Sequence, residues 1–406
     1  MNPVCIFIVL WAGVITISIF LWKPEYTWNY SGVLWILLAC FACLIGGFCA
    51  QKIKLKGTGK DKVIKKLELN KSCWRYLFII VILAFIKVPL DLRMYGFPIS
   101  NLFKVSSWGT VSGYIASERY NEGGAFSIIG QVLGLFIYLA PLFAGFCLNY
   151  SKKKRHIFLC LLSFLPIVLE VILTTGKAGF VASVMLFFIG NTSGYLSRNG
   201  KDMKVSKKLI LKFFLLAIIV FGFLFWAMLW RAGGNLSEIP IIIDKAFVYA
   251  FGSVPSFDNW LGNYYTFKPG FGKETFYAIS SFLGVSTRRP GIYDMLDGYS
   301  QSNVYTCFRG LIQDFGAIGG LFIVFLLGFI GGLAYRIIKS RGKHFWLWLI
   351  VYQITIFYSI YGLIISPWTY TSFILIFPMF FICVILSCKS RPVSKTIKVT
   401  MQYVKS

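Results

Sequence analysis

SNVYTCFRGLIQDFGAIGG, residues 302–320, connects a polar, aromatic-rich loop of about 85 residues to the apolar run 316–338. We see no helix breaker in this stretch, so we expect one helix to continue through it into a membrane. It carries Arg309 and Asp314 at that boundary. Desolvating an arginine or a carboxylate there is costly, so such residues are expected to have interaction partners or a functional role. We therefore interpret residues 302–320 as the wall of an active site.

The composition is that of a membrane protein. Of the 406 residues, 57% are hydrophobic and 14% are charged, with a mean hydropathy of +0.71. Ordinary soluble domains contain about 25% charged residues. We therefore expect an all-α polytopic membrane protein. A net charge of +26 would suggest a nucleic-acid partner in a soluble protein, so the distribution of the charge has to be considered.

Ten apolar segments are long enough, or nearly long enough, to cross a bilayer as helices. They are approximately 4–22, 31–50, 74–90, 127–149, 157–174, 179–196, 209–230, 316–338, 345–365 and 370–388. With both termini cytoplasmic, the inner connections contain 28 of the 41 Lys and Arg residues and three of the 15 acidic residues. This bias follows the positive-inside rule and predicts the orientation. It also assigns the net charge to the inner face, so we expect no nucleic-acid partner.

We expect one integral membrane domain, 1–406, with two long outer loops. The first outer loop is 91–125 and the main outer loop is 231–315. Two apolar pieces of the main loop, 239–251 and 276–285, are shorter than a membrane span. Re-entrant or interfacial helices are expected there.

Glycines with GxxxG spacing occur in the predicted helix 316–338. Gly316 and Gly320 form one pair, and Gly328 and Gly332 form the other. In a membrane helix this spacing places small residues on one face and lets neighbouring backbones approach. We expect this helix to be central in the bundle and its glycines to act in packing.

Several kinds of active site are excluded. The TGK of residues 175–177 resembles part of a P-loop, but the motif's first glycine and its final Ser or Thr are missing, so no nucleotide site is expected. His156 and His344 both lie in basic inner connections, which excludes histidine-driven acid–base catalysis on the outer side. No histidine-based metal cluster is present, and we predict neither a metal nor a cofactor.

The outer loops offer arginine and aromatic side chains. A guanidinium group binds phosphate oxygens in a bidentate manner and stays charged, so arginines suit a pyrophosphate site. Each arginine and aromatic ring also has a structural alternative, as a salt-bridged or interfacial side chain. The candidate anion contacts are Arg119, Arg231, Arg288, Arg289 and Arg309. The rings that offer flat faces to sugars are Trp260, Tyr264, Tyr265, Phe267, Phe271, Phe276 and Tyr277.

Helical spacing separates Arg309 from Asp314. Five residues correspond to roughly 140° around a helix, so we do not expect a simple ion pair within it. Asp314 is expected to face another element, where it pairs with an arginine or accepts a proton from a substrate; a structural ion pair is the alternative. The general base is left open among Asp314, Asp258, Asp294 and Asp297.

Lys177 and Glu170 are the other polar residues near membrane depth. Their spacing of seven places them on one helical face, although Gly176 and Gly179 can end the helix nearby. We expect a local ion pair or, for Lys177, a contact with an anion.

A resemblance to a known family rests on one motif. Asn303-Val304-Tyr305-Thr306, followed by Phe308-Arg309, Asp314-Phe315-Gly316 and Gly319, resembles the oligosaccharide repeat-unit polymerases of the Wzy type, which build O-antigen and related bacterial polysaccharides. TGKAG at 175–179 looks like the family's Gly-plus-basic turn, and SERY at 117–120 is similar to an element of its earlier outer loop. Helix number and loop placement agree along the whole chain.

The resemblance implies a GT-C-like fold and a metal-independent glycosyltransferase at the periplasmic face of the bacterial inner membrane. Its substrates would be oligosaccharide units on undecaprenyl pyrophosphate, within the lipid membrane, and its protein partners a flippase and a chain-length regulator. The implied catalytic residues are Arg309, Asp314, Arg289 and Arg231, of which the first two lie in the matched motif. The implied substrate-binding residues are Arg288, Asn303, Tyr305, Lys177 and Arg119.

Three other functions stay open. An O-antigen ligase has a similar topology, but its outer loop carries a catalytic histidine that this chain lacks on that side. A flippase for lipid-linked sugars should show two related halves and charges inside many helices, and neither pattern is visible. The third function is that of a non-catalytic scaffold of the same assembly complex.

Overall fold

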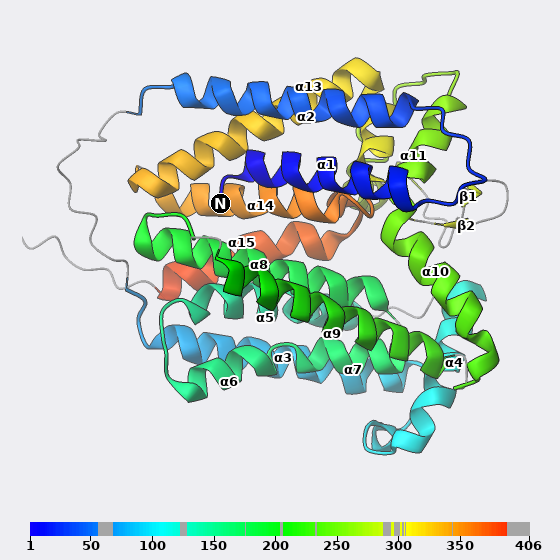
Figure 1. Ribbon diagram of the computed structural model, residues 1–406. Helices are drawn as coiled ribbons and strands as arrows, with labels where there is room; N and C mark the ends of the chain where they lie inside the picture. Colours follow the sequence, from blue (N-terminus) through cyan, green and yellow to red (C-terminus); the bar gives the residue numbers. More distant parts are fainter. Residues whose placement is uncertain are drawn as a thin grey trace, which may run out of the picture.

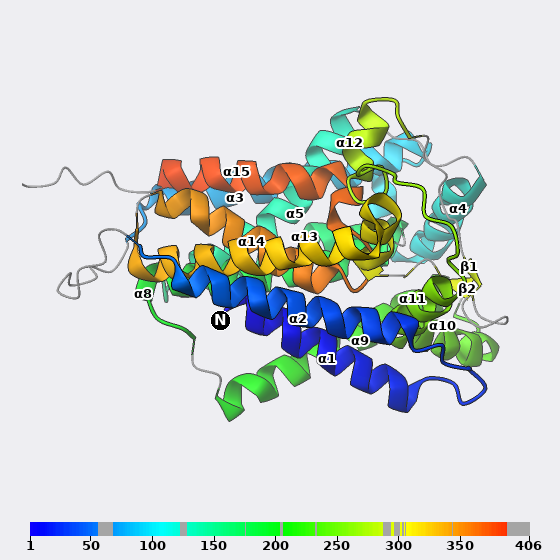
Figure 2. The same ribbon diagram turned by 90° about the horizontal axis from the view of Figure 1, so that it is seen from above.

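Long helices run side by side along one axis, and short helices gather at one end of them (Figure 1, Figure 2). The computed structural model describes residues 1–55, 68–121, 128–174, 176–203, 206–231, 234–286, 294–295, 301–302, 304, 306–342 and 344–387. This part of the chain is helical apart from connections and one antiparallel hairpin, in which β1 (Asp294–Met295) pairs with β2 (Gln301–Ser302).

Each long helix follows one of the predicted apolar runs, because a helix satisfies every backbone polar group that lipid cannot. The long helices are α1 (Pro3–Leu21), α2 (Ser31–Lys52), α3 (Ser72–Met94), α5 (Ile128–Leu148), α8 (Lys177–Asn199), α9 (Lys207–Arg231), α13 (Thr306–Ser340), α14 (Phe345–Tyr361) and α15 (Thr371–Ser387). Two consecutive helices, α6 (Lys154–Leu162) and α7 (Leu165–Thr174), form one further segment of membrane-spanning length.

The short helices belong to the two long loops and the last connection. They are η1 (Ile99–Leu102), η2 (Val105–Ser107), α4 (Trp108–Asn121), η3 (Leu236–Glu238), α10 (Ile239–Phe251), α11 (Ser253–Gly262), α12 (Tyr277–Phe282) and η4 (Pro367–Thr369). The helices η3 and α10 together form one segment, Leu236–Phe251. The helix α11 follows it at an angle of 68°. The prediction of short helices in the main loop is therefore confirmed.

Six helical segments of the described residues are long and apolar enough to cross a membrane, or seven if the bent pair forms one span. The chain is therefore a multi-pass, predominantly helical membrane protein. Within the described ranges, helices occupy all ten predicted segments. The helices α14 and α15 contain 17 residues each and are shorter than any of those six segments. A count of ten spans stays a prediction, as does the GT-C-like fold.

Connections predicted for the inner face meet at one end of the bundle. The Met1 ammonium lies 2.8 Å from Asp202 Oδ1 in the connection after α8, and Lys339 Nζ of α13 lies 3.0 Å from Asp202 Oδ2. The Asn70 amide before α3 donates to the Ser387 carbonyl at the end of α15 at 2.7 Å. The grouping agrees with the predicted topology, whereas the side of the membrane that this end faces stays a prediction.

Close packing of α13 on α2 depends on glycine. A β-carbon on Gly328 would lie 2.1 Å from the Cys43 carbonyl oxygen, and one on Gly46 would lie 2.1 Å from the Phe325 carbonyl oxygen. Only glycine lets two backbones approach this closely. Gly332 also faces α2, so the packing role of the second predicted glycine pair is confirmed. The central position of α13 is confirmed as well, because it also contacts α1, α8, α11 and α14 (Figure 2).

The first predicted glycine pair has a different role. Gly316 has φ +74° and ψ 171°, a non-helical conformation that interrupts α13. A side chain there would be strained, and its β-carbon would lie 3.3 Å from the Phe267 ring. The prediction of one uninterrupted helix through 302–320 is therefore wrong at Gly316, because glycine permits a break where the polar segment ends. Gly320 packs against the Trp35 ring.

A second close pair, α5 with α8, was not predicted by the sequence patterns. β-carbons on Gly145 and Gly190 would lie 2.1 Å and 2.0 Å from the carbonyl oxygens of Phe187 and Leu142. Gly190 and Gly194 have GxxxG spacing and supply the signal that was missed. These contacts pack α8 into the interior of the bundle.

The predicted outer loop 91–125 contains helical structure, and its position outside the membrane stays a prediction. The helix α3 continues to Met94, and α4 occupies Trp108–Asn121. Val111 and Ile115 of α4 are buried, and α4 packs against α7. Burial of one apolar face stabilises a helix whose residues are otherwise polar.

Candidate functional site

An aromatic cluster anchors the first turns of α13. The Phe308 ring is buried, and its centroid lies 4.3 Å from the Trp11 ring of α1 and 4.9 Å from the Trp35 ring of α2. Phe257 of α11 joins the cluster at 6.0 Å. Buried aromatic rings contribute large apolar areas and specific contacts. The cluster therefore determines where the next residue, Arg309, leaves the helix.

Arg309 lies over an aromatic face. Its guanidinium carbon is 5.2 Å from the centroid of the Trp260 ring, and the Tyr264 ring packs against Trp260 at 4.6 Å. A guanidinium group over an indole is attracted by the ring's negative face and presents N–H donors at its edge. The arrangement combines a cation for an anionic group with flat surfaces for a sugar ring.

Asp314 holds a turn of the main loop against α13. Its side chain is buried, and its oxygens accept hydrogen bonds from the backbone amides of Glu274 (3.1 Å) and Thr275 (2.6 Å). Ser366 donates to the Thr275 carbonyl at 2.7 Å, so the turn is bonded from two sides. A β-carbon on Gly270 would lie 2.3 Å from Asp314 Oδ1, so glycine is needed there.

The prediction that Asp314 faces another element is confirmed. Its described hydrogen-bond partners are backbone amides, which engage both carboxylate oxygens. This geometry favours a positioning role for Asp314 over the catalytic role that the resemblance implies. The catalytic role itself stays a prediction.

Glu274 is the carboxyl group that accompanies Arg309. Its turn packs closely on α13, because a β-carbon on Gly310 would lie 3.5 Å from the Glu274 backbone. Partial burial raises the pKa of Glu274, the negative charge of Asp314 raises it further, and Arg309 opposes the shift. A carboxyl group with a raised pKa beside a cation is typical of sites that transfer protons.

The sequence patterns did not single out Glu274. It belongs to the run PGFGKET, 269–275, where Phe271 and Gly272 have φ of +51° and +93°. A Gly-x-Gly turn followed by a charged pair indicates a carboxylate held by an unusual backbone conformation. That signal could have identified Glu274 as a candidate.

Asp258 caps the start of α2. It is buried, and its carboxylate accepts hydrogen bonds from the amides of Asn29, Tyr30 and Gly32 at 2.9, 3.2 and 2.7 Å. The first amides of a helix have no partners within it and favour a negative charge nearby. The geometry therefore favours capping over the general-base role considered for Asp258.

Glu170 pairs with a residue of another helix. Its Oε1 lies 3.1 Å from Lys87 Nζ on α3, and Lys87 also pairs with Asp91. The prediction that Lys177 shares a helical face with Glu170 is wrong, because α7 ends at Thr174 and α8 begins at Lys177. A contact between Lys177 and an anion stays a prediction.

For most of the other predicted site residues, the structure describes no side chain. Those outside the described residues are Arg288, Arg289, Asp297, Asn303 and Tyr305. The side chains of Arg119, Arg231 and Asp294 are also outside the description, although their backbones lie in α4, α9 and β1. Their roles stay predictions, and the site that can be described consists of Arg309, Trp260, Glu274 and Asp314.

The described residues contain no group of three or more His, Cys, Asp or Glu side chains that could hold a metal ion. Cys40 and Cys43 have CxxC spacing, but both are buried in the apolar helix α2.

Comparison of the chain with protein-family models, curated proteins and solved structures finds no match to any of them. The fold and the site define a class: a multi-pass helical membrane protein with a cationic and aromatic site at one end of its bundle. The resemblance to repeat-unit polymerases stays a hypothesis that rests on the motif quoted for it.

Proposed function

We propose that the chain polymerises oligosaccharide repeat units carried on a polyprenyl pyrophosphate, as a glycosyltransferase. The observation that carries the proposal is Arg309 over Trp260, with the Glu274 carboxyl group close enough for its charge to interact with Arg309. Such a donor holds its pyrophosphate at the membrane surface, with the sugar outside and the lipid in the bilayer. A cation, a carboxyl group and aromatic faces at the start of α13 suit each part of that substrate.

The reaction needs a proton acceptor and a countercharge. A hydroxyl group of the incoming unit attacks the anomeric carbon of the growing chain, forming a C–O bond. The bond from that carbon to the pyrophosphate oxygen breaks, and the lipid pyrophosphate leaves with the electron pair. Glu274 takes the hydroxyl proton, a task that its raised pKa suits. Arg309 stabilises the negative charge that develops on the leaving pyrophosphate.

Asp314 positions the base in this mechanism. It bonds the turn that carries Glu274, and so sets the distance between Glu274 and Arg309 without touching the substrate. The proposed location is the bacterial inner membrane, with both termini cytoplasmic and the Arg309 end in the periplasm. The basic connections at the other end of the bundle support that orientation.

Arg309→Ala and Glu274→Gln test the proposal in a strain that lacks the protein. Each variant is expected to insert normally and to reduce the lipopolysaccharide ladder by about a hundredfold or more, because a charge-stabilising contact or the proton acceptor is lost. Arg93→Ala and Glu25→Gln remove the same charges at exposed positions outside the site and should keep the ladder. Equal ladders from all four variants would overturn the proposal.

The kind of defect separates three functions. Loss of a polymerase leaves the lipopolysaccharide core capped with a single repeat unit. Loss of a ligase or of a flippase leaves the core without any unit. A bare core in the strain that lacks this protein would therefore favour one of those two functions over polymerisation.

A further inference from the structure

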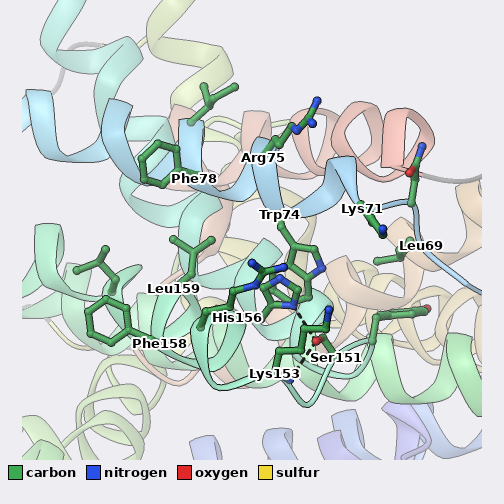
Figure 3. A pocket seen from close by; sticks show the side chains of 15 residues that line it. Leu69, Lys71, Trp74, Arg75, Phe78, Ser151, Lys153, His156, Phe158 and Leu159 are labelled. Carbon is green, nitrogen blue, oxygen red and sulfur yellow. Dashed lines mark hydrogen bonds between the residues drawn. The ribbon is translucent and has the colours of Figure 1, made fainter.

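A cavity of about 850 Å³ lies between the starts of α3 and α6 (Figure 3). These helix starts lie at the opposite end of the bundle from the start of α13, to which Arg309 belongs (Figure 1). Its lining comes from 69–79 and from 150–162. The first range contains the start of α3, and the second contains the connection after α5 and most of α6. The cavity therefore lies where basic connections meet the apolar bundle.

The charged side chains in the wall of the cavity are all cationic. Lys71 and Arg75 contribute cations from α3 and the residue before it, and Lys153 and Arg155 contribute cations from the other side. None of the 15 described residues that line the cavity is acidic. Like charges gathered around one space repel each other, and an anion between them relieves that repulsion. The wall is thus complementary to a phosphate group.

Stacking and hydrogen bonds hold the two sides of the cavity together. The His156 ring lies parallel to the Trp74 ring, with centroids 3.8 Å apart and planes 10° apart. His156 Nδ1 is hydrogen-bonded to the Ser151 hydroxyl at 2.7 Å, and the Lys153 amide donates to the same hydroxyl at 3.2 Å (Figure 3). The cationic side chains therefore project from a connected frame.

Apolar side chains continue the wall along the outside of the helices. Phe78 and Ile79 are each 51% exposed, and Phe158 is 65% exposed. In a multi-pass membrane protein, exposed apolar side chains on the flank of the bundle contact acyl chains. An anion held by the cations of this cavity therefore lies next to lipid tails.

We propose that this cavity binds the phosphate headgroup of an anionic phospholipid whose acyl chains lie along Phe78 and Phe158. Lysine and arginine bind phosphate oxygens through charge-assisted hydrogen bonds, and basic pockets between membrane helices suit anionic headgroups. A soluble phosphate would satisfy the cations and leave the apolar half of the wall without a partner. The phospholipid is therefore the occupant that fits both halves. This site does not depend on the polymerase proposal.

The test measures the thermal midpoint of the full chain in detergent, with phosphatidylglycerol, phosphatidylcholine or inorganic phosphate added. Lys71→Gln/Arg155→Gln removes two cations from the cavity, and Lys152→Gln/Lys154→Gln removes two from the same region that do not line it. All four positions are exposed, so both double variants should fold. Phosphatidylglycerol should raise the thermal midpoint of the wild type and of the control variant. The cavity variant should need about tenfold or more lipid for the same rise, because it binds the lipid more weakly.

Each other outcome overturns the proposal. Equal weakening in both double variants would assign the effect to overall charge. Weakening in neither would mean that the cations of the cavity do not hold the lipid. An equal rise with phosphatidylcholine would assign it to general lipid solvation. A rise with inorganic phosphate alone would assign the cavity to a soluble anion, and no rise with any addition would mean that it binds none of them.

Discussion

Glu274 and Asp314 are neighbouring carboxyl groups with opposite surroundings. Asp314 is buried with both oxygens bonded to backbone amides, whereas Glu274 is only partly buried and its charge interacts with that of Arg309. Helical spacing was enough to predict that Asp314 faces another element. Helical spacing could not identify Glu274, which lies 40 residues before Asp314 in the sequence. Glu274 reaches the site because the main loop folds back onto α13.

Polymer formation is expected to depend on the ionisation of Glu274. Its raised pKa means that the proton-accepting carboxylate is lost at a higher pH than in an ordinary glutamate, whose pKa is about 4.3. Rates measured in isolated membranes should therefore fall as the pH decreases through the Glu274 pKa. Asp314→Asn removes a charge that raises this pKa, so it should move the fall to lower pH. An unmoved profile in a folded Asp314→Asn protein would contradict the assignment of the base.

Asp258→Ala is expected to lower the free energy of unfolding by about 1–3 kcal/mol, because three amides at the start of α2 lose their acceptor. Asp244→Ala is the control. The Asp244 side chain is 54% exposed, and its ion pair with Lys23 at 3.0 Å should contribute less than about 1 kcal/mol. Denaturant unfolding in detergent measures both, and equal losses would rule out the capping role.

Between helices, backbone contacts at glycine explain why α2 packs on α13 and α5 on α8. The pair Gly328 and Gly332 was predictable, because a repeated small residue on an apolar helix has a direct packing consequence. The break at Gly316 was not predictable from spacing. The same GxxxG pattern permits either a packing face or a left-handed backbone, and contacts such as that with Phe267 select between them.

Gly328→Ala tests the contact between α2 and α13. Its β-carbon would meet the Cys43 carbonyl oxygen at 2.1 Å, so the helices must separate, and the expected loss of stability is about 1–3 kcal/mol. Gly13→Ala is the matched control, since no atom lies within 4 Å of the added β-carbon. It should be neutral or slightly stabilising, because alanine favours a helix. Thermal midpoints in detergent compare the two, and a neutral Gly328→Ala would contradict the close contact.

For the molecule as a whole, apolar length and charge distribution were sufficient to predict the class. Helices occupy the ten predicted segments within the described residues, and the basic connections meet at one end. The helix α4 was not predictable, because its sequence is neither clearly apolar nor amphipathic and its helical form depends on burial against α7. Span number and orientation depend on the bilayer. The free energy of burying apolar segments in lipid is not visible in contacts within the protein.

The two ends of the bundle have different chemistry. One carries Arg309 among aromatic rings and a carboxyl group, and the other carries a basic cavity beside exposed apolar side chains. A lipid-linked substrate at the first end and an anionic phospholipid at the second would both approach from the bilayer. The purified protein is therefore best assayed in a membrane that contains anionic lipid.

The most direct test of polymerisation uses the protein in liposomes. Lipid-linked repeat units extracted from a strain that lacks the protein serve as the only substrate, with EDTA present and no nucleotide added. We predict lipid-linked products longer than one unit, together with released polyprenyl pyrophosphate, for the wild type and not for Arg309→Ala. If only single units persist with folded wild-type protein, the proposed function is contradicted.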